Sequence, residues 1–489
     1  MHLKNRLSIA CGWVAPRFPG SFGATLFLLL VCAFAPTARG RSAPLALCPD
    51  NPHYLLFRGK PVFLLGSTEH YGAVLNRDFN DHRYLDALQH DGMNVTRLFS
   101  GAYVEPAGAF HIDKNTLAPV AGRLLCPWAR AGEAGYANGG GKFDLSRWDQ
   151  AYFARLRDFV SEAGKRGIVV EVVLFCPYYD ERQWTLSPLN SGNNVNGIGT
   201  VPRTQANTLT NGNLLAVQDA MVRKIADELK DADNIYYEIC NEPYFGGVTL
   251  EWQYHILATL RAAEKNLPHR HLAAQNIGNG SQKIQKPNPG VSIFNFHYAT
   301  PPDAVAVNYG LGRVIADDET GFKGTGDAAY RKEAWEFMLA GGGIFDHLDY
   351  SFAVGHEDGS FKFPPTQPGG GGPELRRQFK ILASFLAGFD FIHMTPDAAI
   401  VRSPLPKGVS AHFLADKGRA YAGYIHGAGC KQVELAIAPG AYKVEWIDVK
   451  SGKVREKQEV DFGERHETLT VPAYTQEIAL RIVADKPSP

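Results

Sequence analysis

The stretch Asn234-Ile-Tyr-Tyr-Glu-Ile-Cys-Asn-Glu-Pro243 decides the fold prediction. Its first half alternates apolar and aromatic side chains in the manner of a buried β-strand, and Pro243 ends the strand because proline cannot donate to a sheet ladder. The strand therefore carries Asn241 and Glu242 at its carboxyl end, where a parallel α/β barrel holds its active site. A carboxyl beside a carboxamide suits cleavage of a glycosidic bond, although the motif alone also fits a strand followed by a solvated turn.

Further apolar segments on both sides of this strand alternate with helical patterns. They begin near residues 62, 94, 168, 272, 291, 313 and 343. Apolar residues recur every three to four positions between 152 and 163 and between 214 and 229, as in amphipathic helices. This alternation predicts an α/β fold with a (β/α)8 barrel over residues 45–395. The connection 276–290 is the weakest point of the pattern, because it is short and rich in Gly, Asn and Pro.

Two long segments, 101–142 and 177–212, show little periodicity and are expected to be loops at the barrel rim. After about residue 396 the hydrophobic period changes to two. The segments 419–425, 432–438, 442–447 and 476–482 alternate in this way and are separated by turns. Residues 396–489 are therefore expected to form a small antiparallel β-sandwich.

Residues 1–38 have the pattern of a secretory signal peptide. Basic residues precede an apolar run from Leu26 to Ala35, which is too short to span a bilayer. We therefore expect a secreted or periplasmic protein with no transmembrane span in the mature chain, and an uncleaved anchor is the alternative. The formal net charge is zero, so nothing in the composition argues for a nucleic-acid partner. The sequence makes no prediction about the oligomeric state.

Five cysteines lie outside the predicted signal: Cys48, Cys126, Cys176, Cys240 and Cys430. An odd and widely scattered set is not a disulfide framework. The chain has no Cys-x-x-Cys pair and no His-Glu-x-x-His motif, so we predict neither a metal site nor a cofactor.

A second carboxylate, Glu319, follows the predicted seventh strand. In an eight-stranded barrel it could face Glu242 across the axis, and a retaining glycosidase needs two such carboxyls roughly 5–5.5 Å apart. One must be protonated and the other ionised, which a shared pocket can arrange. Strand alternation places Asp317 on the face of Glu319 and Asp318 on the other face, so Asp317 is an alternative nucleophile.

Four motifs resemble the clan of retaining barrel glycosidases that includes the family 5 cellulases and mannanases. They are Asn241-Glu242-Pro243, Glu319-Thr320-Gly321, Arg97 in the second strand and His297-Tyr298 after the sixth. The resemblance implies that Glu242 is the acid/base and Glu319 the nucleophile. It also implies that Asn241 binds a sugar 2-hydroxyl and that His297 and Tyr298 position the site.

The chain departs from that family pattern at three places. His297 and Tyr298 are adjacent where the family has His-x-Tyr, Phe175-Cys176 stands where a His is usual, and residues 346–349 replace a usual Trp. These departures affect the prediction of the substrate more than the prediction of the reaction chemistry. The C-terminal segment is similar to a domain type named for collagen binding, which does not establish a ligand.

Other residues that could contact the substrate could instead have a purely structural role. A buried Arg97 needs a carboxylate partner, and Glu238 is expected to be an ion-pair partner for it. His70 and Asp349 are candidate sugar contacts, and Trp184 either stacks on a sugar or packs a loop.

Together these features predict a secreted glycosidase that cleaves the O-glycosidic bonds of a poly- or oligosaccharide by double displacement, without a cofactor. A non-catalytic glycan- or matrix-binding protein on a barrel scaffold is one alternative. An inverting hydrolase is another.

Overall fold

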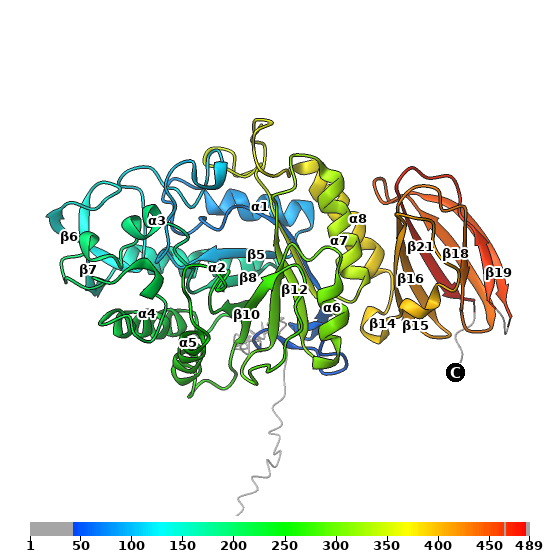
Figure 1. Ribbon diagram of the computed structural model, residues 1–489, viewed down its shortest axis with the longest axis horizontal. Coiled ribbons are helices and arrows are strands. Elements are labelled where there is room, and N and C mark those ends of the chain that lie inside the picture. The colour runs from blue at the N-terminus through cyan, green and yellow to red at the C-terminus, as the bar shows by residue number, and fades with distance from the viewer. Residues whose placement is uncertain (1–42, 464–465, 486–489) are drawn as a thin grey trace, which may run out of the picture. The chain divides into compact units, whose positions relative to one another are not determined.

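The computed structural model describes residues 43–463 and 466–485 (Figure 1). The predicted signal peptide, residues 1–38, lies outside this range. Within it, none of the helices has the length and apolar character that a bilayer crossing requires.

Eight parallel strands form the central sheet, and each matches one of the predicted strand positions. They are β4 (Leu64–Thr68), β5 (Val95–Phe99), β8 (Val169–Val173), β9 (Ile235–Glu238), β10 (Leu272–Asn279), β11 (Ile293–His297), β12 (Val314–Thr320) and β13 (Ile344–Leu348). Their order is β4-β13-β12-β11-β10-β9-β8-β5. Asn94 links the first and last strands of this order, because its backbone N donates to Leu65 O at 3.2 Å and its Oδ1 accepts from Leu65 N at 2.7 Å. The sheet thus comes close to a closed barrel, as the alternating pattern predicted.

Helices connect these strands on the outside of the barrel (Figure 1). They are α1 (Asp81–Asp91), α2 (Gln150–Lys165), α4 (Leu214–Leu229), α5 (Leu250–Ala263), α6 (Asp303–Asn308), α7 (Asp327–Leu339) and α8 (Pro373–Ala387). The apolar stripe predicted for α2 is its buried face, and Asp149 caps the helix by accepting from the backbone N of Ala151 and Tyr152. The segment between β10 and β11 contains no helix, as the composition of 276–290 indicated.

The two segments expected to be loops hold regular structure as well. Residues 101–142 and their continuation contain the hairpin of β6 (Trp128–Ala134) and β7 (Gly141–Trp148). Its register shifts twice, which explains why no regular period is visible in the sequence. The second segment contains α3 (Glu181–Leu186). Asp180 and Gln183 form a capping box at the N-terminus of this helix.

Short strands precede the barrel, and an antiparallel region follows it. The strands before the barrel are β1 (Ala46–Leu47), β2 (Leu55–Phe57) and β3 (Lys60–Val62). The strands of the antiparallel region are β14 (Thr395–Pro396), β15 (Ser410–Asp416), β16 (Ala420–His426), β17 (Gln432–Leu435), β18 (Gly440–Ile447), β19 (Val454–Phe462), β20 (Glu467–Thr470) and β21 (Glu477–Ala484). A six-stranded sheet, β14-β15-β16-β21-β18-β19, and the β17-β20 ribbon share one apolar core. This is the predicted antiparallel sandwich.

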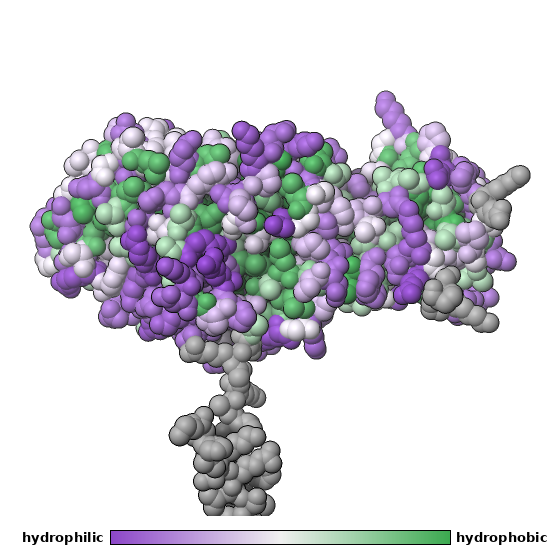
Figure 2. Space-filling view, turned by 90° about the horizontal axis from the view of Figure 1, so that it is seen from below, coloured by the Kyte–Doolittle hydropathy of each residue, from purple (hydrophilic) through white to green (hydrophobic). Residues whose placement is uncertain are grey.

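The sandwich packs on α7 through buried side chains. Arg331 forms an ion pair with Glu477, and the ring of Trp335 stacks on Tyr424 with centroids 5.4 Å apart. On the face shown in Figure 2, hydrophilic residues cover most of the surface and hydrophobic residues show between them. All five cysteines of the described residues are free and buried, so they act as small apolar groups.

Candidate active site

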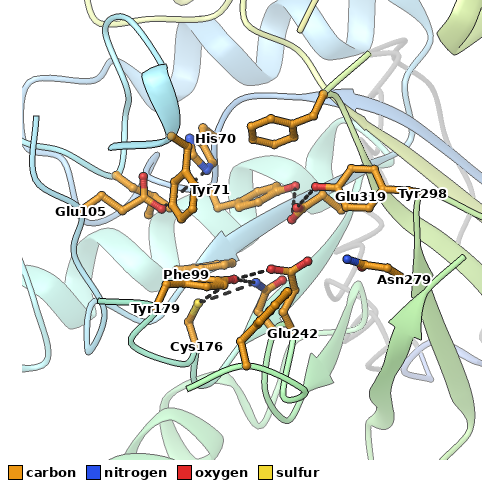
Figure 3. A pocket seen from close by; sticks show the side chains of 15 residues that line it. His70, Tyr71, Phe99, Glu105, Cys176, Tyr179, Glu242, Asn279, Tyr298 and Glu319 are labelled. Atoms are coloured by element: carbon orange, nitrogen blue, oxygen red, sulfur yellow. Dashed lines mark hydrogen bonds and ion pairs between the residues drawn. The ribbon is translucent and has the colours of Figure 1, made fainter. Parts of the chain in front are cut away.

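A pocket of about 440 Å³ lies at the carboxyl ends of the barrel strands (Figure 3). Its lining comes from the ends of β4, β5, β8, β9, β10, β11 and β12 or from the segments that follow them. Both predicted catalytic glutamates, Glu242 and Glu319, are among the lining residues. Residues far apart in the sequence therefore meet at the end of the barrel where barrel enzymes carry their chemistry.

Glu242 follows β9 and is 8% exposed. Its Oε2 accepts from Tyr179 Oη at 2.6 Å, and its Oε1 accepts from Tyr244 Oη at 3.0 Å. His297 Nδ1 lies 3.2 Å from the same Oε1. Three groups therefore fix the orientation of this carboxyl, two of them tyrosines that the sequence analysis did not single out.

Glu319 lies near the end of β12 and is 7% exposed. Its Oε1 accepts from Tyr298 Oη at 2.8 Å. Its Oε2 accepts from Tyr71 Oη at 3.0 Å and from Arg97 Nη1 at 3.2 Å. Three donors therefore fix the orientation of this carboxyl towards the pocket.

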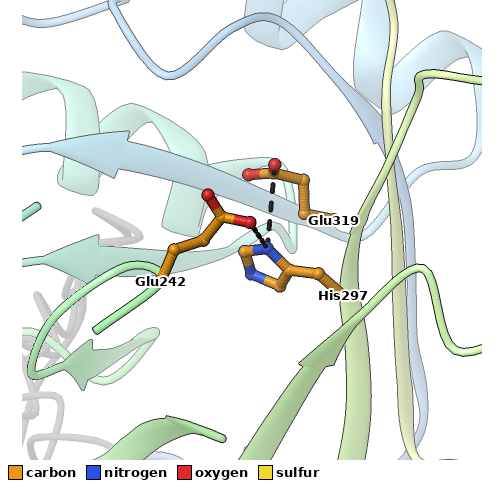
Figure 4. Close-up of side chains that lie close together, drawn as sticks. All are labelled: Glu242, His297 and Glu319. Carbon is orange, nitrogen blue, oxygen red and sulfur yellow. Dashed lines mark hydrogen bonds and ion pairs between the residues drawn. The ribbon is translucent and has the colours of Figure 1, made fainter. Parts of the chain in front are cut away.

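The two glutamates and His297 converge on one small space (Figure 4). A carboxylate oxygen of each glutamate and a ring nitrogen of His297 lie within 4.8 Å of one another. His297 Nδ1 is 3.2 Å from Glu242 Oε1 and 3.7 Å from Glu319 Oε1. Two carboxylates and an imidazole could also ligate a metal ion by donor type. Here Arg97 already supplies a positive charge beside Glu319.

The pKa values of Glu242 and His297 shift in opposite directions. Burial raises the pKa of Glu242, but the hydrogen bonds from His297, Tyr179 and Tyr244 outweigh it and hold this pKa below its usual value. Burial lowers the pKa of His297, but the nearby charge of Glu319 and the bonds to Asp318 and Glu242 raise it well above its usual value. Both shifts favour the charged form of each group, and His297 Nδ1 lies within hydrogen-bond reach of the Glu242 carboxylate.

Arg97 lies fully buried beneath the pocket and connects it to a lower tier of carboxyls. Its Nε is 3.0 Å from Glu171 Oε2, and its Nη2 is 3.1 Å from Glu238 Oε2 and from Asn241 Oδ1. The predicted pair of Arg97 and Glu238 is present, and Arg97 also contacts the pocket residues. Burial raises the pKa of Glu171 to about 7 and that of Glu238 to about 8.

The prediction for the orientation of Asp317 and Asp318 is wrong. The pairing of β11 with β12 shifts register between Phe296 and His297, which disturbs the strict alternation of faces. Asp318 therefore faces the barrel interior, with its Oδ1 3.4 Å from His297 Nε2. Asp317 instead accepts from the backbone N of Ala299 at 3.2 Å and does not line the pocket.

The remaining candidates divide into pocket and packing positions. Asn241 and His70 line the pocket, and Asn241 Nδ2 donates to Tyr179 Oη at 3.1 Å. Asp349 does not line it, because it is buried in an ion pair with Arg376 and accepts from Ser67 Oγ.

Trp184 lies outside the pocket lining as well. Its indole N–H donates to Val201 O at 3.2 Å, and its ring packs against Tyr178 with centroids 4.7 Å apart. This geometry matches the loop-packing alternative for Trp184.

Four residues of the pocket hold unusual backbone conformations. Tyr71, Phe110, Glu242 and Tyr298 have φ values of 58°, 53°, 37° and 54°, in the left-handed region that favours glycine. Such conformations are often found at functional sites, where the surrounding structure enforces them. No sequence pattern indicates this strain. The one available signal for Tyr71 and Tyr179 was that a tyrosine closely follows the end of a predicted strand.

Comparisons with known proteins agree with this architecture. The sequence profile of Cellulase (glycosyl hydrolase family 5) matches residues 57–320, more than half of the chain. A Bacteroides vulgatus protein assigned as a glycoside hydrolase is 15% identical over 91% of this chain and 82% of its own, with a TM-score of 0.62. A family 5 glycoside hydrolase from the same species is 15% identical over 91% of this chain and 94% of its own, with a TM-score of 0.60. At such identities the likeness shows the fold, and no curated protein sequence matches this chain. By its family profile, the chain belongs to glycosyl hydrolase family 5 and is a glycosidase.

Proposed function

We propose that this glycosidase cleaves the O-glycosidic bonds of a poly- or oligosaccharide by double displacement, with Glu319 as the nucleophile and Glu242 as the acid/base. The observation that carries the proposal is that carboxylate oxygens of the two residues lie within 4.8 Å of each other. Retaining glycosidases hold their carboxyls about 5–5.5 Å apart, whereas inverting enzymes need about 6.5–9.5 Å to admit a water molecule.

In the first step, Glu319 attacks the anomeric carbon while Glu242 protonates the oxygen of the departing group. Hydrogen bonds from Tyr298, Tyr71 and Arg97 hold the Glu319 carboxylate in position for this attack. The proton for the departing group comes from His297 Nδ1 through Glu242 Oε1, 3.2 Å away. The glycone is then bound covalently to Glu319, and the leaving group departs as an alcohol.

In the second step, Glu242 acts in its ionised form as a base. It removes a proton from water, the water oxygen attacks the anomeric carbon, and the bond to Glu319 breaks. The lowered pKa of Glu242 suits this step. Asn241, which lies beside both Arg97 and Tyr179, is placed to bond the 2-hydroxyl of the sugar in both steps. No step uses a cofactor.

The leader pattern in residues 1–38 supports a secreted or periplasmic enzyme. The substrate of a glycosidase is a carbohydrate, which fits such a location.

The test replaces each glutamate by glutamine. Glu319→Gln should abolish turnover of every glycoside that the wild type cleaves. Glu242→Gln should lower kcat/KM about 10²- to 10⁴-fold on unactivated glycosides, because general-acid catalysis contributes that much to the first step, and far less on dinitrophenyl glycosides, whose leaving group needs no proton in that step. Full activity of both variants would refute the assignment.

Asp317→Asn is the matched control. Asp317 is buried and does not line the pocket, and the carboxamide oxygen of an asparagine can still accept from the backbone N of Ala299. This variant should keep its activity. Proton NMR of the first-formed product separates retention from inversion, and an inverted anomer would contradict double displacement.

A further inference from the structure

Four exposed aromatic side chains lie around the pocket: Phe110, Tyr244, Phe245 and Phe322, each 38% to 44% exposed. No other Phe, Tyr or Trp between residues 43 and 463 or 466 and 485 is exposed to this degree. The three phenylalanines line the pocket, and the hydroxyl of Tyr244 bonds to Glu242. We refer to these four residues as the aromatic rim. Exposed apolar groups gathered at one site indicate a binding surface.

Three of the rim residues surround the proposed acid. Tyr244 and Phe245 follow Glu242 in the chain, separated from it by Pro243 alone. The rings of Phe245 and Phe110 lie 5.6 Å and 5.3 Å from the ring of Tyr179, which donates to Glu242. Because the acid protonates the leaving oxygen, this side of the pocket holds the leaving group.

Polar groups of the lining gather around His70 and Glu105, on the side away from Asn279, the residue that bonds to Tyr244. Glu105 is 4% exposed and accepts from Tyr103 Oη at 3.0 Å and from Asn115 Nδ2. His70 Nε2 lies 3.9 Å from Glu105 Oε1, and its buried Nδ1 makes no hydrogen bond in the described part of the chain. Figure 3 shows His70 and Glu105 on the side away from Asn279. This end offers hydrogen-bonding groups to the hydroxyls of a sugar.

The rim offers few such groups. Phenylalanine has none, and the single hydroxyl hydrogen of Tyr244 is taken up by Glu242 Oε1 or Asn279 Oδ1, both within hydrogen-bond distance. A second sugar placed there can stack an apolar face on these rings, but its hydroxyls find few protein partners, and each hydroxyl that loses water without gaining a partner costs free energy. An aryl or alkyl group would bury apolar surface against the rim at no such cost.

We propose that the sugar binds at the His70–Glu105 end and that the leaving group, held by the aromatic rim, is an apolar aryl or alkyl body. The substrate is then a glycoside of an apolar alcohol, with the saccharide on the glycone side only. Glu319 takes the glycone, the apolar alcohol leaves with the proton from Glu242, and water releases the sugar. This inference rests on the function proposed above and names the leaving group for the same site.

The experiment compares methyl, butyl, hexyl and octyl β-glycosides of glucose, mannose and galactose. Their alcohols are similar leaving groups, so differences in kcat/KM report binding of the alkyl chain. For the accepted sugar, kcat/KM should rise about threefold for each methylene that contacts the rim. Phe245→Ala and Phe110→Ala should flatten this rise. Leu250→Ala, which removes an exposed apolar side chain outside the pocket, should not change it.

Two results would overturn the proposal. One is a rate that does not depend on alkyl length, and the other is a disaccharide of the same glycone that the wild type cleaves faster than the octyl glycoside.

Binding to Glu319→Gln, measured by calorimetry with methyl and octyl 1-thio-β-glycosides, gives a readout that does not need turnover. Equal affinities would also refute the role of the rim. If no glycoside of any kind is hydrolysed by the wild type while the octyl thioglycoside still binds more tightly, the proposed function fails and the apolar site stands.

Discussion

Arg97→Met tests whether one buried guanidinium holds the active-site carboxyls together. The substitution leaves Glu171, Glu238 and Glu319 without the group that lies 3.0, 3.1 and 3.2 Å from them. Removing one partner of a buried ion pair costs about 3–5 kcal/mol, because the other charge stays buried without compensation. We therefore expect the free energy of unfolding at pH 8, measured by urea denaturation, to fall by about that amount.

The size of the loss should depend on pH. Burial already raises the pKa of Glu171 to about 7 and that of Glu238 to about 8, and loss of Arg97 raises both further. The unfolded chain titrates these groups near pH 4.5, so between pH 4.5 and 8 the folded state binds more protons and its stability falls as the pH rises. At pH 5 both carboxyls are protonated when folded, so the difference between variant and wild type should be smaller there than at pH 8.

Arg83→Met serves as the control, since Arg83 is half exposed and pairs with Asp358 at 2.6 Å on the surface. Exposed pairs contribute about 0–1 kcal/mol, and this variant should show no strong pH dependence. The reasoning is refuted if Arg97→Met is as stable as Arg83→Met at pH 8, or if its deficit is larger at pH 5.

Two further predictions concern the pocket itself. Tyr298→Phe removes a donor 2.8 Å from Glu319 Oε1 and should lower kcat/KM about 10- to 100-fold, because hydrogen bonds to charged groups contribute about 1.5–3 kcal/mol. Tyr309→Phe, whose buried hydroxyl makes no hydrogen bond in the described part of the chain, should leave the rate unchanged, and an equal loss in both would contradict the assignment. Burial raises the pKa of Glu105 to about 7, so the folded state favours its protonated form and loses stability as the pH rises from 4.5 through 7. Glu105→Gln should therefore raise the melting temperature, relative to wild type, more at pH 8 than at pH 5, and a uniform shift would show that the ionisation of Glu105 is not involved.

The barrel could be predicted from the sequence because each strand is a short apolar run that ends in polar residues. Asn241 and Glu242 were predicted at the strand end on the same grounds, and Arg97 required a partner that Glu238 supplies. These inferences depend on the local pattern of apolar and polar residues and on the free-energy cost of burying a charge, and both can be judged from the sequence alone.

Other features depend on tertiary context that no local pattern records. The register shift between β11 and β12 turns Asp318 inward against the expected alternation. The hairpin of β6 and β7 has irregular register and so no visible period. Tyr71 and Tyr179 bond to the glutamates from segments distant in the chain, and only the closed barrel brings these pairs together.

The left-handed backbone at Tyr71, Glu242 and Tyr298 has a practical consequence for protein engineering. Each such residue costs of the order of 1–3 kcal/mol, which glycine would recover at Glu242, whose side chain is not part of the apolar core. A library screened for heat tolerance alone would therefore enrich glycine at position 242, which holds the proposed acid/base. Durable but inert variants would dominate the survivors unless every round of selection also scored turnover.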